Sequence, residues 1–418
     1  MKFSEPLAGI LYFFATQSSM NWPIVPKEAA DDTVLDLRSQ VAGTGIWNRA
    51  DVQEDIRFVW KRNPGFGQDE RGDLPYIDQE DWVVVPEYAA GLAQFKAGNV
   101  YMYAVQAEDV IITKKDVPDL EMMSTKLITT PRYVIVGQSA DSPFTDERVR
   151  QAYSMSWERD LFIDTVYNVG KFEAEGLPME TRCSSILQAE SWEGWWLDPK
   201  GSDFGENARY YEHNIDEAKA LLSAAGHPDG LDFDSAVPLD SPYGPTYVRD
   251  IDIVTGMTQE TGFRANQSDP MFATEFRQTY SQGNGDFSGL SYVNLFSAGI
   301  DPASWFFRYL NSAGSVFYGF DVDGSSSHKG DPKLDDLTNK LRLEADAEAA
   351  MALAHDIQRY AAAKMYFIAF PGGANSFDLA WPCVRNRMVY VDDTSRPIGV
   401  GNTGNGALWI DQTKPPFT

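Results

Sequence analysis

The sequence predicts an α/β fold, and three observations support this class. Short runs in which apolar and polar residues alternate, as in residues 56–61 (IRFVWK), are typical of half-buried strands. Segments with apolar stripes at helical spacing and good capping residues are typical of helices. The chain has 418 residues, of which 43% are apolar, and this is enough for at least two hydrophobic cores. We therefore expect a folded protein and not a disordered one.

Strands are more evident than helices in the first 137 residues, and helices are more evident from about 140 to 375. The predicted strands lie at 56–61, 81–85, 132–136, 366–370 and 387–391. The predicted helices lie at 7–19, 87–97, 146–161 and 214–225, with a pair between 333 and 364. We interpret 7–19 as a helix because Glu5 and Pro6 interrupt the apolar run that a signal peptide requires. Asn63-Pro64-Gly65 has the composition of a turn.

The segment from 142 to 161 predicts a turn that starts an amphipathic helix. Pro143 disfavours helical backbone at Ser142, and either Thr145 or Asp146 can cap the helix that follows. One apolar stripe at i, i+4, i+8 and i+12 is expected to face the core: Val149, Tyr153, Trp157 and Leu161.

A second local pattern marks the helix at 214–225. Asn214 is a good N-cap, and Glu217 three residues later completes a capping box. Gly226 and Pro228 are expected to end this helix.

The charge of the chain limits its partners. Sixty-one acidic and thirty-five basic residues give a formal net charge of −26, which repels phosphate backbones and argues against nucleic-acid binding. The acidity is spread along the chain, and it fits either ordinary solubility or a saline habitat. Apolar runs such as 83–85 are far too short to span a bilayer.

No metal, cofactor or catalytic signature is present. Cys183 and Cys383 lie two hundred residues apart, so two separate buried thiols or a single bridge are possible, but not a zinc cluster. The histidines have no ligand spacing, residues 43–45 (GTG) lack the third glycine of a dinucleotide loop, and no GxSxG elbow occurs. A pair of carboxylates, as in a glycosidase, is not excluded by counting acids.

Eight short motifs occur in the order of one known family. They are IVPKE (24–28), GTG (43–45), KRNP (61–64), LPYID (74–78), LAQFKAGNV (92–100), PFTDERVRQA (143–152), DEAK with GHPDG (216–230), and DP with DPKLD (301–335). In these motifs the chain resembles the extracellular solute-binding proteins of family 5, the peptide, nickel and oligosaccharide receptors of ABC importers. The resemblance begins inside the family pattern, so we expect an N-terminally incomplete chain.

The resemblance implies a two-lobed, periplasmic-binding-protein-like α/β fold with mixed sheets and a hinge. The first lobe would comprise residues 1–137 with the returning segment 376–418, and the second lobe would comprise 138–375. Crossings near Gly137 and Gly372-Gly373 would serve as the hinge, since glycine absorbs backbone rotation, although glycines also form simple turns.

The function implied is capture of a small peptide-like or oligosaccharide solute in an interlobe cleft by hinge closure, without catalysis. The expected partners are the permease subunits of an ABC importer, and the expected state is a monomer. The expected location is the periplasm or the outer face of the cell membrane, with an export signal upstream of residue 1. The alternative function is a carbohydrate-active hydrolase or carbohydrate-binding module that uses tryptophan clusters and a carboxylate pair.

The family's peptide-binding members have an aspartate for the peptide amine in a stretch before the DP motif. Here no acid precedes Asp301 in this stretch, which favours a neutral polar solute over a free amine. The candidate ligand-binding residues are Gln138, Tyr292, Asn294, Phe296, Trp305 and Arg308. Some of these candidates also have a structural alternative. Tyr292 could simply pack in the core, Asn294 could form a turn, and Arg308 could form a surface salt bridge. The aromatic cluster at 192–196 (WEGWW) could stack on a sugar or could pack inside the protein.

Overall fold

The computed structural model describes most of the chain as two units. The described residues are 26–30, 34–35, 43, 45–66, 74–189, 194–244, 246–295, 301–318, 329–387 and 406–418. Within these residues, unit 1 comprises 127–374, and unit 2 comprises the residues up to 126 together with those from 375 onward. The predicted helix at 7–19, the residues 388–391 of the last predicted strand and the candidate Phe296 lie outside the described residues.

Unit 1 is built on a five-stranded mixed sheet with the strand order β11-β6-β10-β8-β9. Strand β6 pairs antiparallel with both β11 and β10, whereas β10, β8 and β9 run parallel to one another. A smaller sheet in the same unit has the order β5-β12-β7. The strands are β5 (Ile128–Thr129), β6 (Arg132–Val136), β7 (Thr181–Cys183), β8 (Leu231–Ala236), β9 (Phe263–Ser268), β10 (Leu290–Asn294), β11 (Phe367–Ala369) and β12 (Gly372–Ala374).

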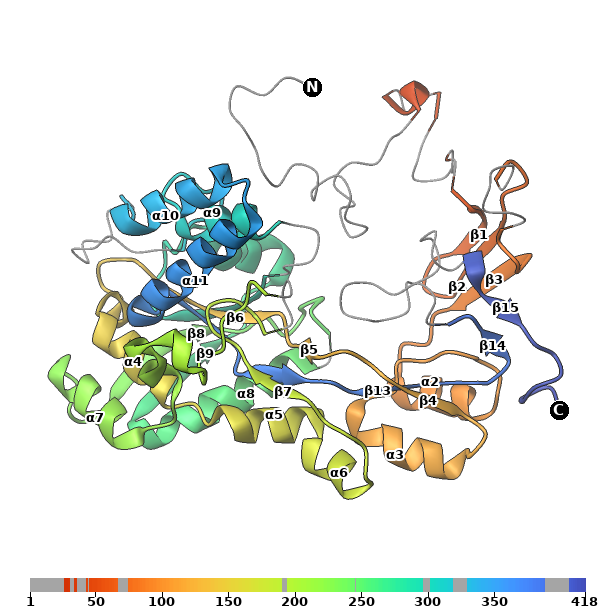
Figure 1. Ribbon diagram of the computed structural model, residues 1–418, viewed down its shortest axis with the longest axis horizontal. Helices are drawn as coiled ribbons and strands as arrows, with labels where there is room; N and C mark the ends of the chain where they lie inside the picture. Colours follow the sequence, from red (N-terminus) through yellow and green to blue (C-terminus); the bar gives the residue numbers. More distant parts are fainter. Residues whose placement is uncertain are drawn as a thin grey trace. The chain divides into compact units, whose positions relative to one another are not determined.

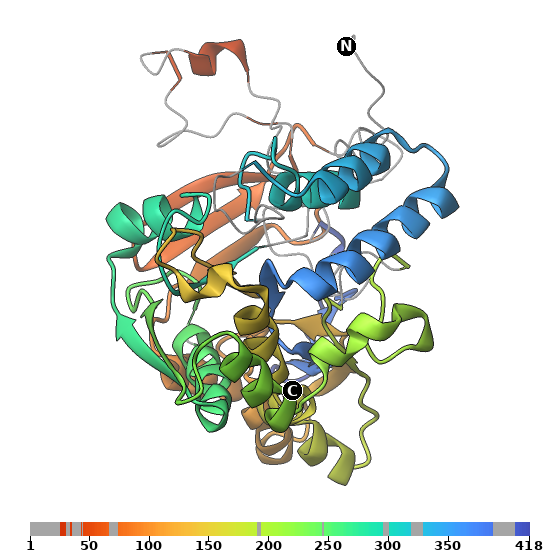
Figure 2. The same ribbon diagram turned by 90° about the vertical axis from the view of Figure 1, so that its left-hand side faces the viewer.

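Helices surround this sheet, and α10 packs against both α9 and α11 at one side of unit 1 (Figures 1 and 2). The helices are α4 (Glu147–Met155), α5 (Arg159–Tyr167), α6 (Val169–Ala174), α7 (Ile215–Ala224), α8 (Thr246–Thr258), α9 (Pro302–Leu310), α10 (Pro332–Leu343) and α11 (Ala347–Lys364). A π-helix spans Phe272–Ser281, and 3₁₀ turns span Pro143–Thr145, Ser202–Phe204, Glu206–Tyr211 and Gln259–Thr261. The core between helices and sheet is rich in aromatic rings, with Phe144 meeting Tyr153, Phe233 and Phe263.

The start of helix α4 is as predicted, but its end is not. The Asp146 carboxylate accepts a hydrogen bond from the backbone N–H of Arg148 at 2.9 Å, which confirms it as the cap. The helix stops at Met155, where the Ser156 hydroxyl donates to the carbonyl of Ala152 at 2.7 Å. Serine hydroxyls that bond back to the preceding turn compete with the backbone ladder, which accounts for the break.

The predicted apolar stripe therefore ends with α4 and the residues just after it. Val149, Tyr153 and Trp157 are fully buried, as predicted. Leu161 lies in the separate helix α5 and is 47% exposed, so its predicted place in the core is wrong. The one-helix spacing fails because α4 and α5 are separate helices, divided by residues 156–158.

Other helices and strands of unit 1 confirm the local sequence signals. The Asn214 side chain accepts from the N–H of Glu217 at 3.1 Å and caps α7, and Gly226 follows the helix with a φ of +101°. The predicted strands at 132–136 and 366–370 are β6 and β11, and the predicted helix pair is α10 and α11.

Two glycines named as hinge residues are required by close packing inside unit 1. A Cβ at Gly137 would lie 2.1 Å from the carbonyl oxygen of Phe287, and one at Gly372 would lie 2.2 Å from that of Arg182. No side chain fits at either position without a backbone shift. Their role as hinge residues stays a prediction.

Unit 2 contains an antiparallel three-stranded sheet, β1-β2-β3, and two strand pairs, β4 with β13 and β14 with β15. The strands are β1 (Trp47–Gln53), β2 (Arg57–Arg62), β3 (Gln79–Val83), β4 (Glu121–Ser124), β13 (Phe377–Ala380), β14 (Val384–Arg385) and β15 (Trp409–Ile410). The helices are α2 (Tyr88–Lys96) and α3 (Ala107–Asp116), with a 3₁₀ turn at Lys27–Ala30.

Most of the elements that the sequence predicts in unit 2 are present in the structure. The predicted helix at 87–97 is α2, and Gly98 follows it with a φ of +76°. In the predicted turn, the Asn63 side chain accepts from the N–H of Gly65 at 3.0 Å. The strand predicted at 81–85 begins and ends two residues earlier, as β3, because its register follows β2.

Because of the Glu80 carboxyl in β3, we expect the free energy of unfolding to depend on pH. Burial raises the pKa of its carboxyl from 4.5 to about 7, against the lowering effect of Trp82. A raised pKa in the folded state means that the stabilisation is complete below pH 4.5 and is lost as the pH rises through 7. Glu80→Gln, which mimics the protonated acid, should therefore raise the melting temperature more at pH 8 than at pH 5.

The control for Glu80→Gln is Asp81→Asn, which removes one charge from the next, exposed residue of the same strand. Thermal unfolding of both variants at pH 5 and pH 8 measures the effect. An equal shift for Glu80→Gln at the two pH values would show that its carboxyl is not held neutral by burial.

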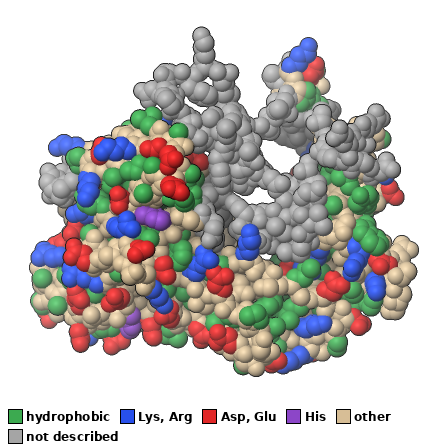
Figure 3. Space-filling view, in the orientation of Figure 1, with side chains coloured by type: hydrophobic (Ala, Val, Ile, Leu, Met, Phe, Trp, Pro, Cys, Tyr) green, Lys and Arg blue, Asp and Glu red, His purple; other side chains and the backbone are tan. Residues whose placement is uncertain are grey.

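The charged surface agrees with the composition. Figure 3 shows acidic and basic side chains intermixed over the described part of one face, without a block of one sign. Within the described residues, no helix is both long and apolar enough to cross a membrane. Cys183 in unit 1 and Cys383 in unit 2 are both free and buried.

Candidate functional site

The carboxyl end of β10 positions the most suggestive of the predicted residues, Asn294. The antiparallel register pairs Asn294 with Arg132, at the start of β6. Asn294 is half-buried, and its Oδ1 atom has no hydrogen-bond partner. A buried amide oxygen without a partner costs free energy and is a natural acceptor for a ligand group or an ordered water.

A buried ion pair supports this end of the sheet. The Arg132 guanidinium lies 2.9 Å from the carboxylate of Asp250 on α8, and their side chains are 2% and 1% exposed. The guanidinium also lies over the rings of Tyr247, at 4.8 Å, and Phe370, at 5.3 Å. Burial lowers the pKa of Arg132, and the charge of Asp250 opposes this effect. The pair fixes α8 against the sheet beside Asn294.

One tyrosine contacts Asn294, and two more lie near that tyrosine. The backbone N–H of Asn294 donates to the phenol of Tyr243, whose pKa is raised by burial. Tyr309 of α9 stacks on Tyr318 with ring centroids 5.8 Å apart, and the phenol of Tyr243 acts electrostatically on both. We call Tyr243, Asn294, Arg308, Tyr309 and Tyr318 the Tyr243 cluster. All five residues belong to unit 1.

Arg308 gives this cluster a positive charge. It lies in the last turn of α9, half-buried, with its guanidinium 5.4 Å from the centre of the Tyr309 ring. Its Nε has no hydrogen-bond partner, and among the described residues Arg308 forms no ion pair. The surface salt bridge that remained open for Arg308 is therefore not observed in this part of the chain.

The surrounding charges are also mainly positive. The guanidinium groups of Arg132 and Arg277 both act on the Tyr243 phenol, and Asp250 is engaged with Arg132. In a chain with a net charge of −26, such a local excess of arginine is a departure from the overall charge. The arrangement can attract and bind an anionic group.

Two predicted ligand residues lie in the core instead. Tyr292 is fully buried, with its hydroxyl 3.3 Å from the hydroxyls of both Tyr153 and Thr255. Trp305 is also fully buried and meets the rings of Tyr133 and Phe367. Trp305 also packs on Tyr309 of the Tyr243 cluster, with ring centroids 5.1 Å apart, but neither Trp305 nor Tyr292 belongs to the cluster.

Gln138 does not share a site with Asn294. It follows β6 at the Val136 end, whereas Asn294 pairs with Arg132 at the other end, and the two ends are roughly 13 Å apart. The Gln138 amide is buried without hydrogen-bond partners beneath Gly285. The six predicted residues are therefore not all part of one small site.

Sequence reasoning missed Tyr243, Tyr309 and Tyr318. Tyr243 lies about fifty residues before Asn294, in the Pro- and Gly-containing stretch 241–245, and no spacing links the two residues. The parallel pairing of β8 with β10 brings these segments together. The only local signal was an aromatic residue in a turn, which is too common to identify a site.

Two other sequence features have structural roles. Asp301 caps α9 by accepting from the N–H of Ser304 at 2.9 Å, so its carboxylate is engaged and buried. In the aromatic cluster, Trp195 and Trp196 pack against the core, and the Trp196 indole donates to the carbonyl of Cys183 at 3.1 Å. Packing, and not an exposed stacking platform, is the role of these two tryptophans.

Comparison with known proteins identifies a family. The family model described as bacterial extracellular solute-binding proteins, family 5 Middle, matches residues 1–317. The dipeptide-binding protein of Escherichia coli (strain K12) is 22% identical over 260 residues, which cover 62% of this chain and 44% of that protein. The chain thus spans less than half the length of this relative.

Solved structures show the same fold. The periplasmic binding protein AgaA of A. tumefaciens R10, in complex with agropinic acid, has a TM-score of 0.70 at 17% identity, covering 98% of this chain and 75% of that one. DppA of Helicobacter pylori, in complex with the peptide STSA, has a TM-score of 0.69 at 15% identity, covering 97% and 71%. The predicted fold class, α/β with mixed sheets and similar to periplasmic binding proteins, is confirmed.

Proposed function

The chain belongs to the bacterial extracellular solute-binding proteins of family 5, and from this premise we propose that it captures a small solute for an ABC importer. In this proposal it acts as a monomer outside the cytoplasm, delivers the solute to membrane permease subunits and catalyses no reaction. Hinge closure over the solute, as implied by the resemblance, is part of the same proposal. The alternative of a carbohydrate-active hydrolase finds no support in the matches.

We further propose that the solute bears a carboxylate. The observation that supports this most is the unpaired guanidinium of Arg308 in the Tyr243 cluster. A carboxylate there would form a charge-assisted hydrogen bond, and the phenols and the Asn294 amide would bind its polar neighbours. Burying the guanidinium beneath a neutral solute would instead leave its charge without a partner.

The relatives' ligands are compatible with this class. AgaA was solved with agropinic acid and DppA with a peptide, and both ligands carry carboxylates. The missing acid before Asp301 disfavours a ligand held mainly by its amine. An opine-like acid or a peptide with a blocked or distant amine therefore fits better than a neutral saccharide.

A thermal-shift screen of the full chain tests the function. The probes are opine-like acids, di- and tripeptides, the same peptides with amidated C-termini, and neutral oligosaccharides. A ligand present at a hundred times its dissociation constant stabilises the folded state by about 2.7 kcal/mol, which is a readable shift.

We expect the stabilising probes to be those with a free carboxylate. A shift with saccharides only would support the neutral solute of the sequence-based prediction and would contradict the carboxylate proposal. A chain that unfolds cooperatively but responds to no class would contradict the receptor function itself.

A further inference from the structure

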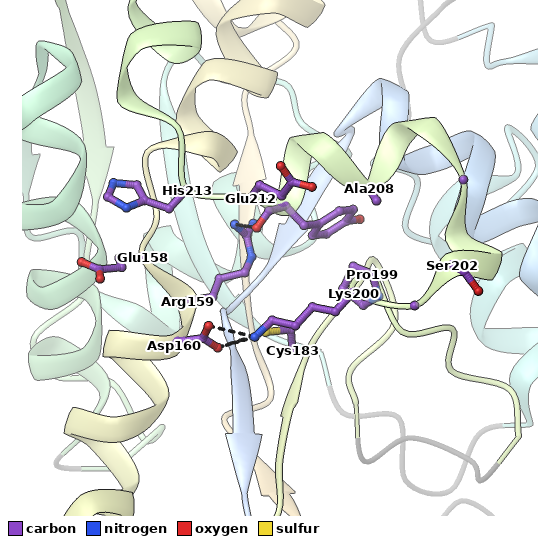
Figure 4. A pocket seen from close by; sticks show the side chains of 13 residues that line it. Glu158, Arg159, Asp160, Cys183, Pro199, Lys200, Ser202, Ala208, Glu212 and His213 are labelled. Carbon is purple, nitrogen blue, oxygen red and sulfur yellow. Dashed lines mark hydrogen bonds and ion pairs between the residues drawn. The ribbon is translucent and has the colours of Figure 1, made fainter.

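A pocket apart from the Tyr243 cluster lies in unit 1, and neither the proposed solute site nor the family match assigns it a role. Its volume is about 700 Å³, within the range of roughly 300–1,000 Å³ that is typical of small-molecule sites. It is formed by the first turn of α5, the end of β7 and the segment from Pro199 to His213 (Figure 4). Arg308 and Asn294 do not line it.

The buried wall of this pocket holds an uncompensated cation. Arg159 is only 4% exposed, and among the described residues it forms no ion pair. Its guanidinium donates to the Ser154 carbonyl at 3.1 Å, the Ser154 hydroxyl at 2.7 Å and the Tyr211 carbonyl at 2.7 Å. Burial lowers the pKa of Arg159 to about 10, so the side chain stays charged at neutral pH.

Arg159 retains hydrogen-bonding capacity after these contacts. A guanidinium has five N–H groups, and three are used here, which leaves the Nε–H, buried without a partner, and one Nη2–H. Two N–H groups are what a carboxylate engages when it binds arginine in a bidentate manner. Arg159 therefore has two N–H groups left for a ligand carboxylate.

The first turn of α5 adds to the positive potential. Its N-cap residue, Glu158, makes no side-chain capping bond, so the first backbone N–H groups of the helix have no such partner. Helix N-termini carry a partial positive charge and bind anions. Lys200 lies beside them, 2.6 and 2.8 Å from the two carboxylate oxygens of Asp160, and neutralises that acid (Figure 4).

The exposed side of the same pocket is acidic. Glu158 and Glu212 are exposed lining residues, and neither forms an ion pair within the described part of the chain. A simple anion would be repelled by these two carboxylates. A ligand with a negative group at one end and a positive group at the other would satisfy both the guanidinium and the exposed acids.

We propose that this pocket binds a free α-amino acid as a zwitterion. Its carboxylate is directed to Arg159 and the N-terminus of α5, and its ammonium group is directed to Glu158 and Glu212. The site goes beyond the proposed solute receptor function and does not depend on it. Because the two sites share no residue, variants of each can be tested separately.

Calorimetric titration of the full chain tests this proposal with three matched probes. L-Leucine has both charges, 4-methylpentanoate lacks the ammonium group, and 3-methylbutylamine lacks the carboxylate. We expect leucine to bind with one-to-one stoichiometry and each analogue to bind at least about tenfold more weakly. Equal binding of the three probes, or no binding of leucine, would overturn the proposal.

Variants locate the bound leucine. Glu158→Gln combined with Glu212→Gln should weaken leucine about tenfold or more, and it should strengthen the binding of 4-methylpentanoate, because the two repelling carboxylates are gone. Glu173→Gln, an exposed acid of α6 outside the pocket, is the control for loss of negative charge and should change nothing. Leucine binding that survives the double variant but is lost in Arg308→Ala would place the ligand in the Tyr243 cluster and refute the pocket. Because these variants replace exposed acids, the test does not depend on removing Arg159, which has structural contacts.

Discussion

Replacing Asp250 by alanine is expected to lower the free energy of unfolding by about 3–5 kcal/mol. The Asp250 carboxylate is buried with the Arg132 guanidinium at 2.9 Å, and both side chains are almost without solvent contact. The variant would leave a buried positive charge without its partner, and the cost of that charge exceeds the value of the pair itself. Urea unfolding followed by tryptophan fluorescence measures the change.

Two controls separate this effect from a general loss of charge. Asp336→Ala breaks the exposed pair between Lys340 and Asp336 and should cost less than about 1 kcal/mol. The double variant Arg132→Met, Asp250→Leu removes both charges and should recover much of the loss. If Asp250→Ala cost no more than Asp336→Ala, the pair would not be a buried support of the sheet.

Truncation of Trp305 to alanine is the second large effect, with an expected loss of about 3–5 kcal/mol. The indole is fully buried against Tyr133, Tyr309 and Phe367, so its removal leaves a large cavity in unit 1. The melting temperature should fall whether or not a ligand is present.

Trp305→Phe distinguishes this core role from a ligand contact. Phenylalanine keeps most of the packing, so the variant should be more stable than Trp305→Ala and should retain the affinity for the solute. If Trp305→Phe kept the wild-type melting temperature but lost its affinity for the solute, Trp305 would contact the ligand, as predicted from the sequence.

Elements defined by local chemistry were predictable. The helix that begins after Asn214 and ends before Gly226 follows from a capping box and a glycine, and both signals act within a few residues. Strand β6 was also located to the residue, since its β-branched and aromatic residues need no long-range information. The family motifs are also short local sequences, and their order along the chain predicted the two-lobed fold.

The parts that were not predictable depend on tertiary contacts. Leu161 was assigned to the core because its spacing continued a stripe, but the hydroxyl of Ser156 ends the helix first. Trp305 and Arg308 lie on the same short helix, yet one is buried in the core and the other is half-buried with an unpaired charge. Tyr243 joined the site through the pairing of β8 and β10, which no local pattern encodes.

The central claim is that Arg308 binds a carboxylate of the solute, and a double-mutant cycle by calorimetry tests it most directly. The best acidic ligand of the screen and its carboxamide are titrated into the wild type and into Arg308→Ala. We predict that either change alone weakens binding by about ten- to a hundredfold and that the two together add little more, because they remove one contact. Losses that simply add would show that Arg308 and the carboxylate do not meet, and would contradict the account.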